Sequence, residues 1–444
     1  MKRKALSIML ACTMAATLAV GCGSSTSTDS SSSSTDSSSA STETAEAADT
    51  AANTADSTEA PADFDYGSGN ITLWVADNVV DFTKAQAEQF IADKGVDYTI
   101  TVEPVGEGSA AGNMITDVEG GADLYGFAQD QTSRLVSAGA LQPLTGTGFD
   151  TWVSDNNDTG AVGAATVGGT VYAFPMTSDN GYFLYYDSSV VTDPSTLEGI
   201  VEQCEAAGKN FYFQIDSGWY NTAFFFGTGC TLEYATDDDG NFTGATIDYA
   251  SDKGVIALQE MIELASSSSY QSGSAIDSAT NIGAIVDGTW DAEAAKSVFG
   301  DNYACAKLPT FTGTDGNTYQ LSGFGGFKLL GVKPQTEGGK LRLCLELAQY
   351  LTNAEVQLAR FNEVGWGPSN IEAQQDPGVV SDIALAALAQ QLAFTIPQGQ
   401  YPGDYWTLSE AMGGDIISGN IASDADSCMS YLENFQSQCE ALVQ

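Results

Sequence analysis

The sequence predicts an α/β fold in which helices flank a parallel or mixed sheet. Strand-like and helix-like stretches alternate from residue 67 onward: GNITLWVAD is followed by FTKAQAEQFIADKG, whose apolar residues recur near helical spacing. VDYTITVEPV then alternates as a strand does, and a helix-like segment separates it from the strand ADLYGF. This βαβα order is typical of sheets covered by helices, and 444 residues are enough for two domains.

Polar and aromatic residues lie at the ends of these strands. Asp77 and Asn78 come after the first strand, while Phe127, Gln129 and Asp130 end or follow ADLYGF. Ligands of such sheets gather at the carboxyl ends of the strands, where the loops converge. We therefore expect these loops to contribute to a binding site.

The rest of the chain continues the mixture of strands and helices. GTVYAFPMTSDNGYFLYYDSSV contains two strand-like pieces, and SGFGGFKLLGV is a further strand. Helical spacing predicts one long helix over 338–365 and two more near 406–419 and 424–442. GFGGF at 323–327 lacks the GxGxxG spacing of a phosphate-binding loop, which favours a strand that crosses between domains. DDDGN at 237–241 lacks the spacing of a calcium loop, which favours an acidic hairpin turn.

The N-terminus predicts a secretory signal peptide over residues 1–21. Three basic residues precede an apolar core that is short for a membrane-spanning helix. LAVGC at 18–22 resembles the lipobox of bacterial lipoproteins, which predicts lipid attachment to Cys22; ordinary signal cleavage near this point is the alternative. Residues 22–66, rich in Ser, Thr, Ala and Asp, predict a disordered tether with a span of about 35 Å.

Composition excludes several classes of function. The formal net charge is −43, from 58 acidic and 15 basic residues, so phosphate backbones and anionic membranes repel the chain, and no nucleic-acid partner is expected. The chain contains no histidine, which excludes Ser-His-Asp and Cys-His catalysis and histidine-ligated metals. Acid/base chemistry by two carboxylates remains open.

Six of the eight cysteines lie in the predicted folded body. None has the spacing of a metal ligand, and no metal or cofactor is predicted. An extracellular location allows the disulfides 204–230 and 428–439, and scattered buried thiols are the alternative. The six are Cys204, Cys230, Cys305, Cys344, Cys428 and Cys439.

Four stretches together resemble the extracellular solute-binding proteins of ABC transporters, in the branch that includes maltose- and maltodextrin-binding proteins. They are ADLYGFAQDQTSRLVSAGALQPL, GTVYAFPMTSDNGYFLYYDSSV, GAIVDGTW with KLPTFTGTDG, and IPQGQYPGDYWTLSEAMGGDIISG. The resemblance implies two α/β lobes that are joined by a hinge and enclose a ligand cleft. It places residues 67–176 and 326–374 in the first lobe and residues 180–320 and 379–444 in the second. The crossings would lie near 177–179, 321–325 and 375–378.

The resemblance also implies binding residues on the first-lobe side. Phe127 falls at a position that stacks on sugar rings, and Gln129 lies beside it in the same loop. Asp130 falls on a hydroxyl-binding aspartate, whereas Gln131 replaces an arginine, a departure that leaves the identity of the sugar open. Asp179 falls on a hydroxyl-binding glutamate just past the first crossing.

The second-lobe side supplies an acid and further aromatic residues. QIDSGWYN at 214–221 matches a loop that carries an acid and a stacking ring, which indicates Asp216 with Trp219 or Tyr220. Trp290 and Trp406 fall on two further stacking tryptophans. Aromatic rings pack against the C–H faces of sugars while carboxylates accept their hydroxyls, so this mixture suits a sugar cleft. Three other tryptophans are left aside: Trp74 as core, Trp152 without a role and Trp366 undecided near the cleft.

The resemblance implies a receptor rather than an enzyme. We expect a monomer, lipid-anchored on the outer face of a Gram-positive cell, that captures maltose or malto-oligosaccharides and delivers them to an ABC permease. A receptor for another oligosaccharide, a receptor for a charged solute, and a secreted glycoside hydrolase with paired carboxylates are the alternatives.

Overall fold

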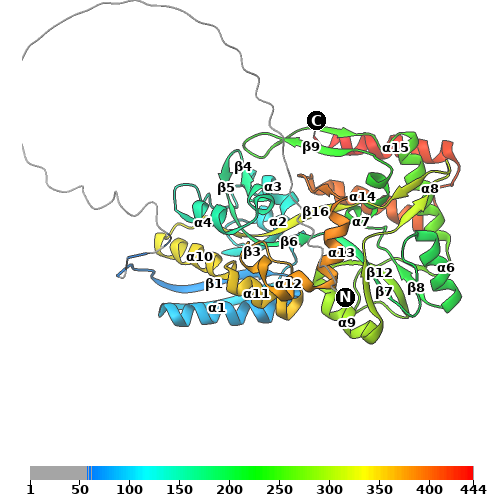
Figure 1. Cartoon of the computed structure of the whole chain (residues 1–444). Coiled ribbons are helices and arrows are strands. Elements are labelled where there is room, and N and C mark those ends of the chain that lie inside the picture. The colour runs from blue at the N-terminus through cyan, green and yellow to red at the C-terminus, as the bar shows by residue number, and fades with distance from the viewer. Residues whose placement is uncertain (1–57, 59, 62, 444) are drawn as a thin grey trace, which may run out of the picture. The chain divides into compact units, whose positions relative to one another are not determined.

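Helices and strands alternate along the chain in the computed structural model, which describes residues 58, 60–61 and 63–443 (Figure 1). The predicted signal peptide, Cys22 and most of the predicted tether lie outside the described residues. Over the described part, no helix combines the length and apolar character needed to cross a membrane.

The first sheet is mixed and has the order β17-β16-β3-β1-β2, with β6 also paired to β16. β1 runs parallel to β2 and β3, whereas β16 runs antiparallel to β3 and β6. Helix α1 (Val80–Lys94) packs on β2 and α10 (Gly338–Leu351) packs on β16 (Figure 1). The strands are β1 (Ser68–Val75), β2 (Asp97–Pro104), β3 (Leu124–Ala128), β6 (Ala173–Asn180), β16 (Phe324–Val332) and β17 (Ile396–Pro397).

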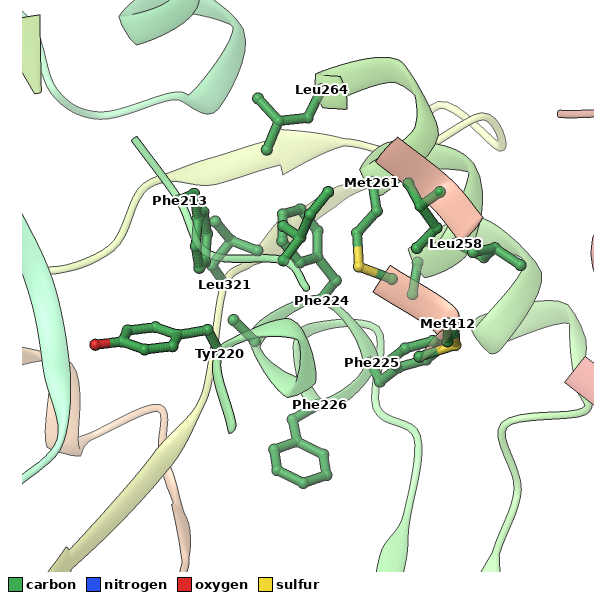
Figure 2. Packing of buried hydrophobic residues seen from close by; sticks show 14 of the residues in the cluster. Phe213, Tyr220, Phe224, Phe225, Phe226, Leu258, Met261, Leu264, Leu321 and Met412 are labelled. Atoms are coloured by element: carbon green, nitrogen blue, oxygen red, sulfur yellow. The ribbon is translucent and has the colours of Figure 1, made fainter. Parts of the chain in front are cut away.

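The second sheet has the order β11-β8-β12-β7-β13. Its largest core cluster gathers Phe224, Phe225 and Phe226 of α7 with residues of α8 and α14, as Figure 2 shows. The strands are β7 (Tyr182–Asp187), β8 (Asn210–Tyr212), β11 (Tyr270–Gln271), β12 (Ile282–Gly288) and β13 (Tyr303–Ala306), and the helices are α7 (Gly218–Gly227), α8 (Asp252–Ser266) and α14 (Gly403–Ile417).

Further helices and hairpin strands complete the fold. The helices are α2 (Glu107–Thr116), α3 (Thr132–Ser137), α4 (Phe149–Asn156), α5 (Thr159–Ala164), α6 (Leu197–Ala207), α9 (Ala292–Phe299), α11 (Ala354–Val364), α12 (Pro377–Ser381), α13 (Ile383–Leu392) and α15 (Ala425–Ala441). The hairpin strands are β4 (Thr166–Val167), β5 (Thr170–Val171), β9 (Leu232–Thr236), β10 (Phe242–Ile247), β14 (Thr310–Thr312) and β15 (Thr318–Gln320).

The chain passes directly from one sheet to the other at Gly181. β6 pairs within the first sheet and β7 within the second, with Gly181 between them. A side chain at Gly181 would approach the Phe324 carbonyl oxygen to 3.2 Å, which explains the need for a small residue where two connecting segments meet. β16 then begins the return to the first sheet, as the GFGGF motif predicts.

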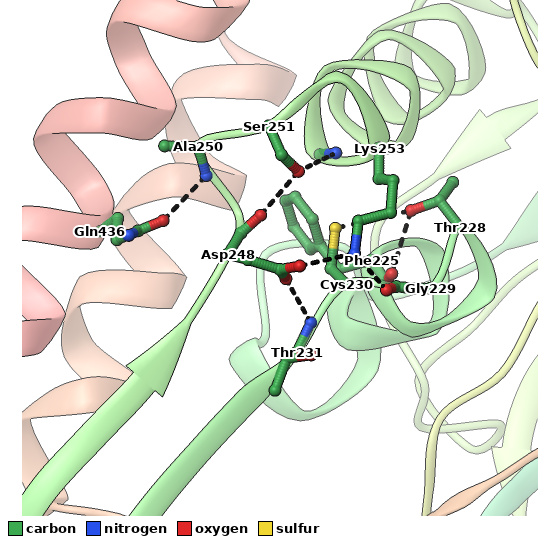
Figure 3. Close-up of polar contacts among 11 residues, drawn as sticks. Phe225, Thr228, Gly229, Cys230, Thr231, Asp248, Ala250, Ser251, Lys253 and Gln436 are labelled. Atoms are coloured by element: carbon green, nitrogen blue, oxygen red, sulfur yellow. Dashed lines mark hydrogen bonds and ion pairs between the residues drawn. The ribbon is translucent and has the colours of Figure 1, made fainter.

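Polar contacts fix α7 and α8 relative to each other (Figure 3). Lys253 at the start of α8 donates to the Gly229 carbonyl at 2.6 Å and pairs with the Asp248 carboxylate at 2.5 Å. Asp248 in turn accepts the Thr231 N–H at 2.5 Å. These contacts stabilise the C-terminal end of α7, a helix that carries aromatic residues of the candidate site at its other end.

The structure corrects one helix prediction. The stretch predicted as a single helix over 338–365 forms α10 and α11: the first ends at Leu351 with Thr352 as its C-cap, and Asn353 caps the second by accepting the Val356 N–H at 2.8 Å. The two C-terminal helices are confirmed, at Gly403–Ile417 and Ala425–Ala441. The acidic turn is also confirmed, since it joins β9 and β10 and Asp237 accepts the Asn241 N–H at 2.8 Å.

The six body cysteines are free thiols, and five of them are buried. Neither of the disulfides considered from the sequence forms in this structure, and the free-thiol alternative describes it.

Candidate functional site

A cavity of about 670 Å³ opens where elements of both sheets meet. The first-sheet side contributes the loop after β1, the start of α2, the loop after β3 and Lys328 of β16. The second-sheet side contributes the start of α7, the short helix Thr289–Asp291 after β12, and the first half of α14. Most of these lining residues lie at the ends of helices and strands, where a side chain can face a ligand without disrupting the hydrophobic core.

One side of the cavity is an aromatic wall, formed by Trp219, Tyr220, Trp290 and Trp406. The ring centroids of Trp219 and Trp290 lie 5.8 Å apart with their planes at 48°. The three indoles are half-buried, so part of each ring is open to the cavity. All four were predicted from the sequence, and the structure brings them together.

The first-sheet side of the cavity is a polar wall, formed by Asp77, Glu107, Asp130, Gln131 and Lys328. It meets the aromatic wall at Lys328, whose Nζ lies 4.8 Å from the centroid of the Trp290 ring. Of these, the sequence prediction included Asp130 as a hydroxyl-binding residue, Asp77 as a loop residue and Gln131 as a departure from the family pattern. Burial raises the pKa of Asp130 to about 7, an effect that its own backbone N–H and the Arg134 charge oppose. Near neutral pH this carboxyl group can therefore either accept or donate a hydrogen bond.

Phe127 lies in the core and does not line the cavity. Its side chain has no exposed surface, and its ring centroid is 5.7 Å from that of Tyr125. β3 is a central strand between β1 and β16, and the Phe127 side chain packs in the hydrophobic core cluster of this sheet, which includes Leu141. A ring without an open face has nothing to offer a sugar, and Ala128 is the strand residue that reaches the cavity.

Three further predicted residues are engaged by protein groups instead. Asp179 accepts the Gly367 N–H at 2.5 Å and the Thr289 hydroxyl, and is 3% exposed. Asp216 accepts the Ser272 hydroxyl. Gln129 donates to the Gln398 carbonyl and lines a second cavity, of about 680 Å³. None of the three lines the first cavity, although Asp179 Oδ1 and Gln129 Oε1 are buried without a hydrogen-bond partner in the described part of the chain.

Sequence reasoning missed several residues that line the cavity. Glu107 begins α2 just after β2, so the rule that ligands gather at strand ends could have identified it. Lys328 is a single charge inside the apolar strand β16. Trp366, which directly follows the glycine that ends α11, was left undecided near the cleft, and the structure places it in the lining. Gln398 accepts the Trp219 Nε1–H at 3.2 Å and gave no local signal, since it lies in an irregular segment.

A buried carboxyl group, that of Asp287, contacts Tyr220 of the aromatic wall. Asp287, at the end of β12, has no exposed surface, and its Oδ1 lies 3.5 Å from the Tyr220 hydroxyl. Burial first, and the neighbouring Asp291 second, hold the pKa of Asp287 well above its usual range. The described residues bring together no group of three acidic or thiol side chains suited to a metal ion.

Comparisons with known proteins agree on family and fold. Residues 85–387 match the family model described as "Bacterial extracellular solute-binding protein". A galactooligosaccharide-binding protein of Bacillus subtilis (strain 168) is 23% identical over 321 residues, which cover 67% of this chain and 73% of that protein. A structure solved with acarbose is 25% identical, with a TM-score of 0.74 over 85% of this chain and all of the other. The ligand-free maltodextrin binding protein MalE1 from L. casei BL23 is 23% identical, with a TM-score of 0.68 over 84% of this chain and 99% of that one. The fold is thus the two-lobe α/β fold with a cleft between hinged lobes.

Proposed function

The chain belongs to the family of bacterial extracellular solute-binding proteins, and we propose that it captures oligosaccharides for an ABC importer. One observation carries the proposal: the lining of one cavity combines four aromatic rings with carboxyl and amide groups. Sugars present apolar C–H faces and hydroxyl groups that both donate and accept, so this pairing of walls matches their two surfaces.

Malto-oligosaccharides are the ligands that we propose first. Several rings along one wall suit a curved glucan, and structural relatives include a maltodextrin binding protein. The relative from Bacillus subtilis is described as binding galactooligosaccharides, so another oligosaccharide is the second candidate. The cavity volume lies within the range of about 300–1,000 Å³ that is usual for small-molecule pockets.

Binding would couple to closure of the lobes, because the cavity takes residues from both. Asn78 of the first lobe donates to the Trp290 carbonyl of the second at 3.2 Å, so the two sides already touch at the rim. A ligand that contacts both walls favours the closed arrangement by its differential affinity. A permease could then recognise the closed form and accept the sugar without covalent chemistry.

We also propose that the protein lies on the outer face of the cell membrane. Cys22 would carry lipid on the outer face of a Gram-positive membrane, and the segment 22–66 would tether a monomeric receptor to it. Such cells lack an outer membrane to retain a free receptor.

Calorimetric titration of the chain from Cys22 onward tests the function. The panel comprises maltose, maltotriose and a β-linked galactotriose, and the sugars are analysed by chromatography afterwards. Saturable binding with unchanged sugars supports a receptor. Shortened sugars would establish the hydrolase alternative instead, and the absence of any binding would refute the oligosaccharide proposal.

A further inference from the structure

Lys328 has an unusual environment for a charged side chain. It is 6% exposed and its ammonium nitrogen lies 3.8 Å from the centroid of the Trp366 ring and 4.8 Å from that of Trp290. Among the described residues, its ammonium group makes no hydrogen bond or ion pair in addition to these two ring contacts. An ammonium group carries three N–H donors, so indole faces alone leave its hydrogen-bonding capacity unused.

Three polar atoms of other residues in the same cavity lining are also without partners. Within the described part of the chain, Trp366 Nε1, Glu107 Oε1 and Gln131 Oε1 are buried atoms that make no hydrogen bond. Gln131 is held in place by its amide nitrogen, which donates to the carbonyls of Glu107 and Gly108, each at 3.3 Å. The lining of this cavity therefore contains two unpaired donors, on Lys328 and Trp366, and two unpaired acceptors, on Glu107 and Gln131.

Buried polar groups without partners are rare in folded proteins, because their desolvation is costly. Three such atoms, and the Lys328 ammonium group without a hydrogen-bond acceptor, belong to side chains that line one cavity, which favours a ligand as the source of the missing partners. A sugar hydroxyl fits this set, since it can donate to a carboxylate while it accepts from an ammonium or an indole N–H.

We propose that Lys328, Trp366, Glu107 and Gln131 form a subsite for one neutral, hydroxylated ring, in which Lys328 is the specificity-determining donor. This deepens the proposed function and rests on it. The charge of the lining favours a neutral ring over an acidic one, because Lys328 is the sole cation among the described lining residues. The carboxyl groups that oppose a ligand carboxylate there are those of Asp77, Glu107, Asp130, Asp291 and Glu410.

The substitution Lys328→Met tests the donor, because it keeps an unbranched side chain and removes the N–H groups. For whichever panel sugar binds the wild-type chain, we expect the dissociation constant to rise about 10- to 100-fold. Lys328→Gln, which retains two N–H donors, should lose less. Lys307→Met is the matched control, since Lys307 lies 5.1 Å from the centroid of the Phe394 ring but outside the cavity lining, and it should bind as the wild type does.

Thermal unfolding of each variant separates a binding defect from a folding defect. If Lys328→Met does not fold, Trp366→Phe replaces it, because phenylalanine retains an aromatic ring and lacks the indole N–H; the expected loss is about 2- to 10-fold. If a folded Lys328→Met variant binds with wild-type affinity, the subsite proposal is wrong while the proposed function is unaffected. The same holds for Trp366→Phe if that variant is used in its place. Failure of the wild-type chain to bind any panel sugar would overturn both.

A pair of probes tests the preference for a neutral ring. Maltotriitol and maltotrionic acid both end in an open-chain unit and differ by the carboxylate, and each is titrated at low and high sodium chloride. We expect maltotriitol to bind more tightly and its affinity to be insensitive to salt. Tighter binding of maltotrionic acid, weakened by salt and by Lys328→Met, would assign the subsite to an acidic sugar and overturn the proposal.

Discussion

The two walls of the cavity differ in how the protein holds them. The side chains of the aromatic wall pack against other protein groups. The ring centroid of Trp406 lies 5.3 Å from that of Tyr401 and 5.0 Å from that of Tyr405, and the Tyr220 hydroxyl lies 3.5 Å from Asp287 Oδ1. The polar wall instead keeps Glu107 Oε1 and Gln131 Oε1 unpaired. A braced apolar surface provides affinity for many rings, whereas unpaired polar groups discriminate among them. We therefore expect substitutions in the aromatic wall to weaken binding of all sugars and those in the polar wall to change which sugar is preferred.

Trp406→Ala should give the largest effect. The loss of a stacking ring costs about 2 kcal/mol, or roughly 30-fold in the dissociation constant. The loss should be similar for every sugar that binds, and calorimetric titration of the oligosaccharide panel measures it. Trp152→Ala is the control, because Trp152 is a half-buried tryptophan of α4 outside this cavity. A loss confined to one sugar would contradict the division between the walls.

Asp130→Asn should give a smaller and more selective effect. The substitution removes one charge-assisted hydrogen bond, which is worth about 1.5 kcal/mol or about tenfold in affinity. We expect the ratio of affinities for maltotriose and galactotriose to change, in contrast to Trp406→Ala. An unchanged ratio would place Asp130 outside the set of specificity residues.

Asp130 also predicts a pH dependence of stability. Its pKa is about 7 in the folded protein and 3.8 is the ordinary value, so the folded state retains a proton that the unfolded state has lost between these two pH values. The contribution of Asp130 to the free energy of unfolding is therefore fully present below about pH 4, falls as the pH rises to about 7, and then levels off. Asp130→Asn should flatten this part of the curve of melting temperature against pH.

Glu260 provides the matched control for that measurement. It lies on α8, away from the cavity, and burial followed by the Glu198 charge raises its pKa to about 8. Glu260→Gln should also flatten the stability curve, but it should leave sugar binding unchanged. A flattened curve in Glu260→Gln alone would show that Asp130 does not titrate in this range.

Asp179→Asn should affect stability rather than binding. The carboxylate accepts the Thr289 hydroxyl and the Gly367 N–H, and so ties the β12 turn to the segment after α11. We expect a loss of about 1–3 kcal/mol in the free energy of unfolding, with affinity within about threefold of the wild type. If affinity falls more than tenfold in a stable variant, the residue contacts the sugar as its sequence position implies.

The sequence was most informative where a residue's role follows from its place at the end of an element. Trp290 follows a buried strand, and Asp130 lies in the loop after β3, so pattern and topology agreed with what the family resemblance implied for both. Lys328 could not be predicted as a lining residue, because its neighbours Leu329 and Leu330 have the pattern of core and its partners Trp290 and Trp366 come from distant segments. Asp179 was assigned to the ligand from the family resemblance, and the sequence could not reveal its protein partners, Thr289 and Gly367, because both are more than 100 residues away in the chain. Local sequence patterns therefore predict which loops form the site, but contacts between residues distant in the chain determine which side chains of those loops remain available to a ligand.

Phe127→Leu gives the smallest expected effect and makes the sharpest distinction. Its ring packs in the core, close enough to Gly331 that a side chain there would lie 3.0 Å from the ring. Leucine keeps an apolar side chain of smaller volume, so we expect a loss of about 1 kcal/mol in stability. Because the ring has no open face, affinity for every panel sugar should equal that of the wild type. Chemical denaturation measures the first quantity and calorimetry the second. A loss of affinity as large as that of Trp406→Ala would mean that Phe127 leaves the core when sugar binds, and that the aromatic wall extends to both lobes.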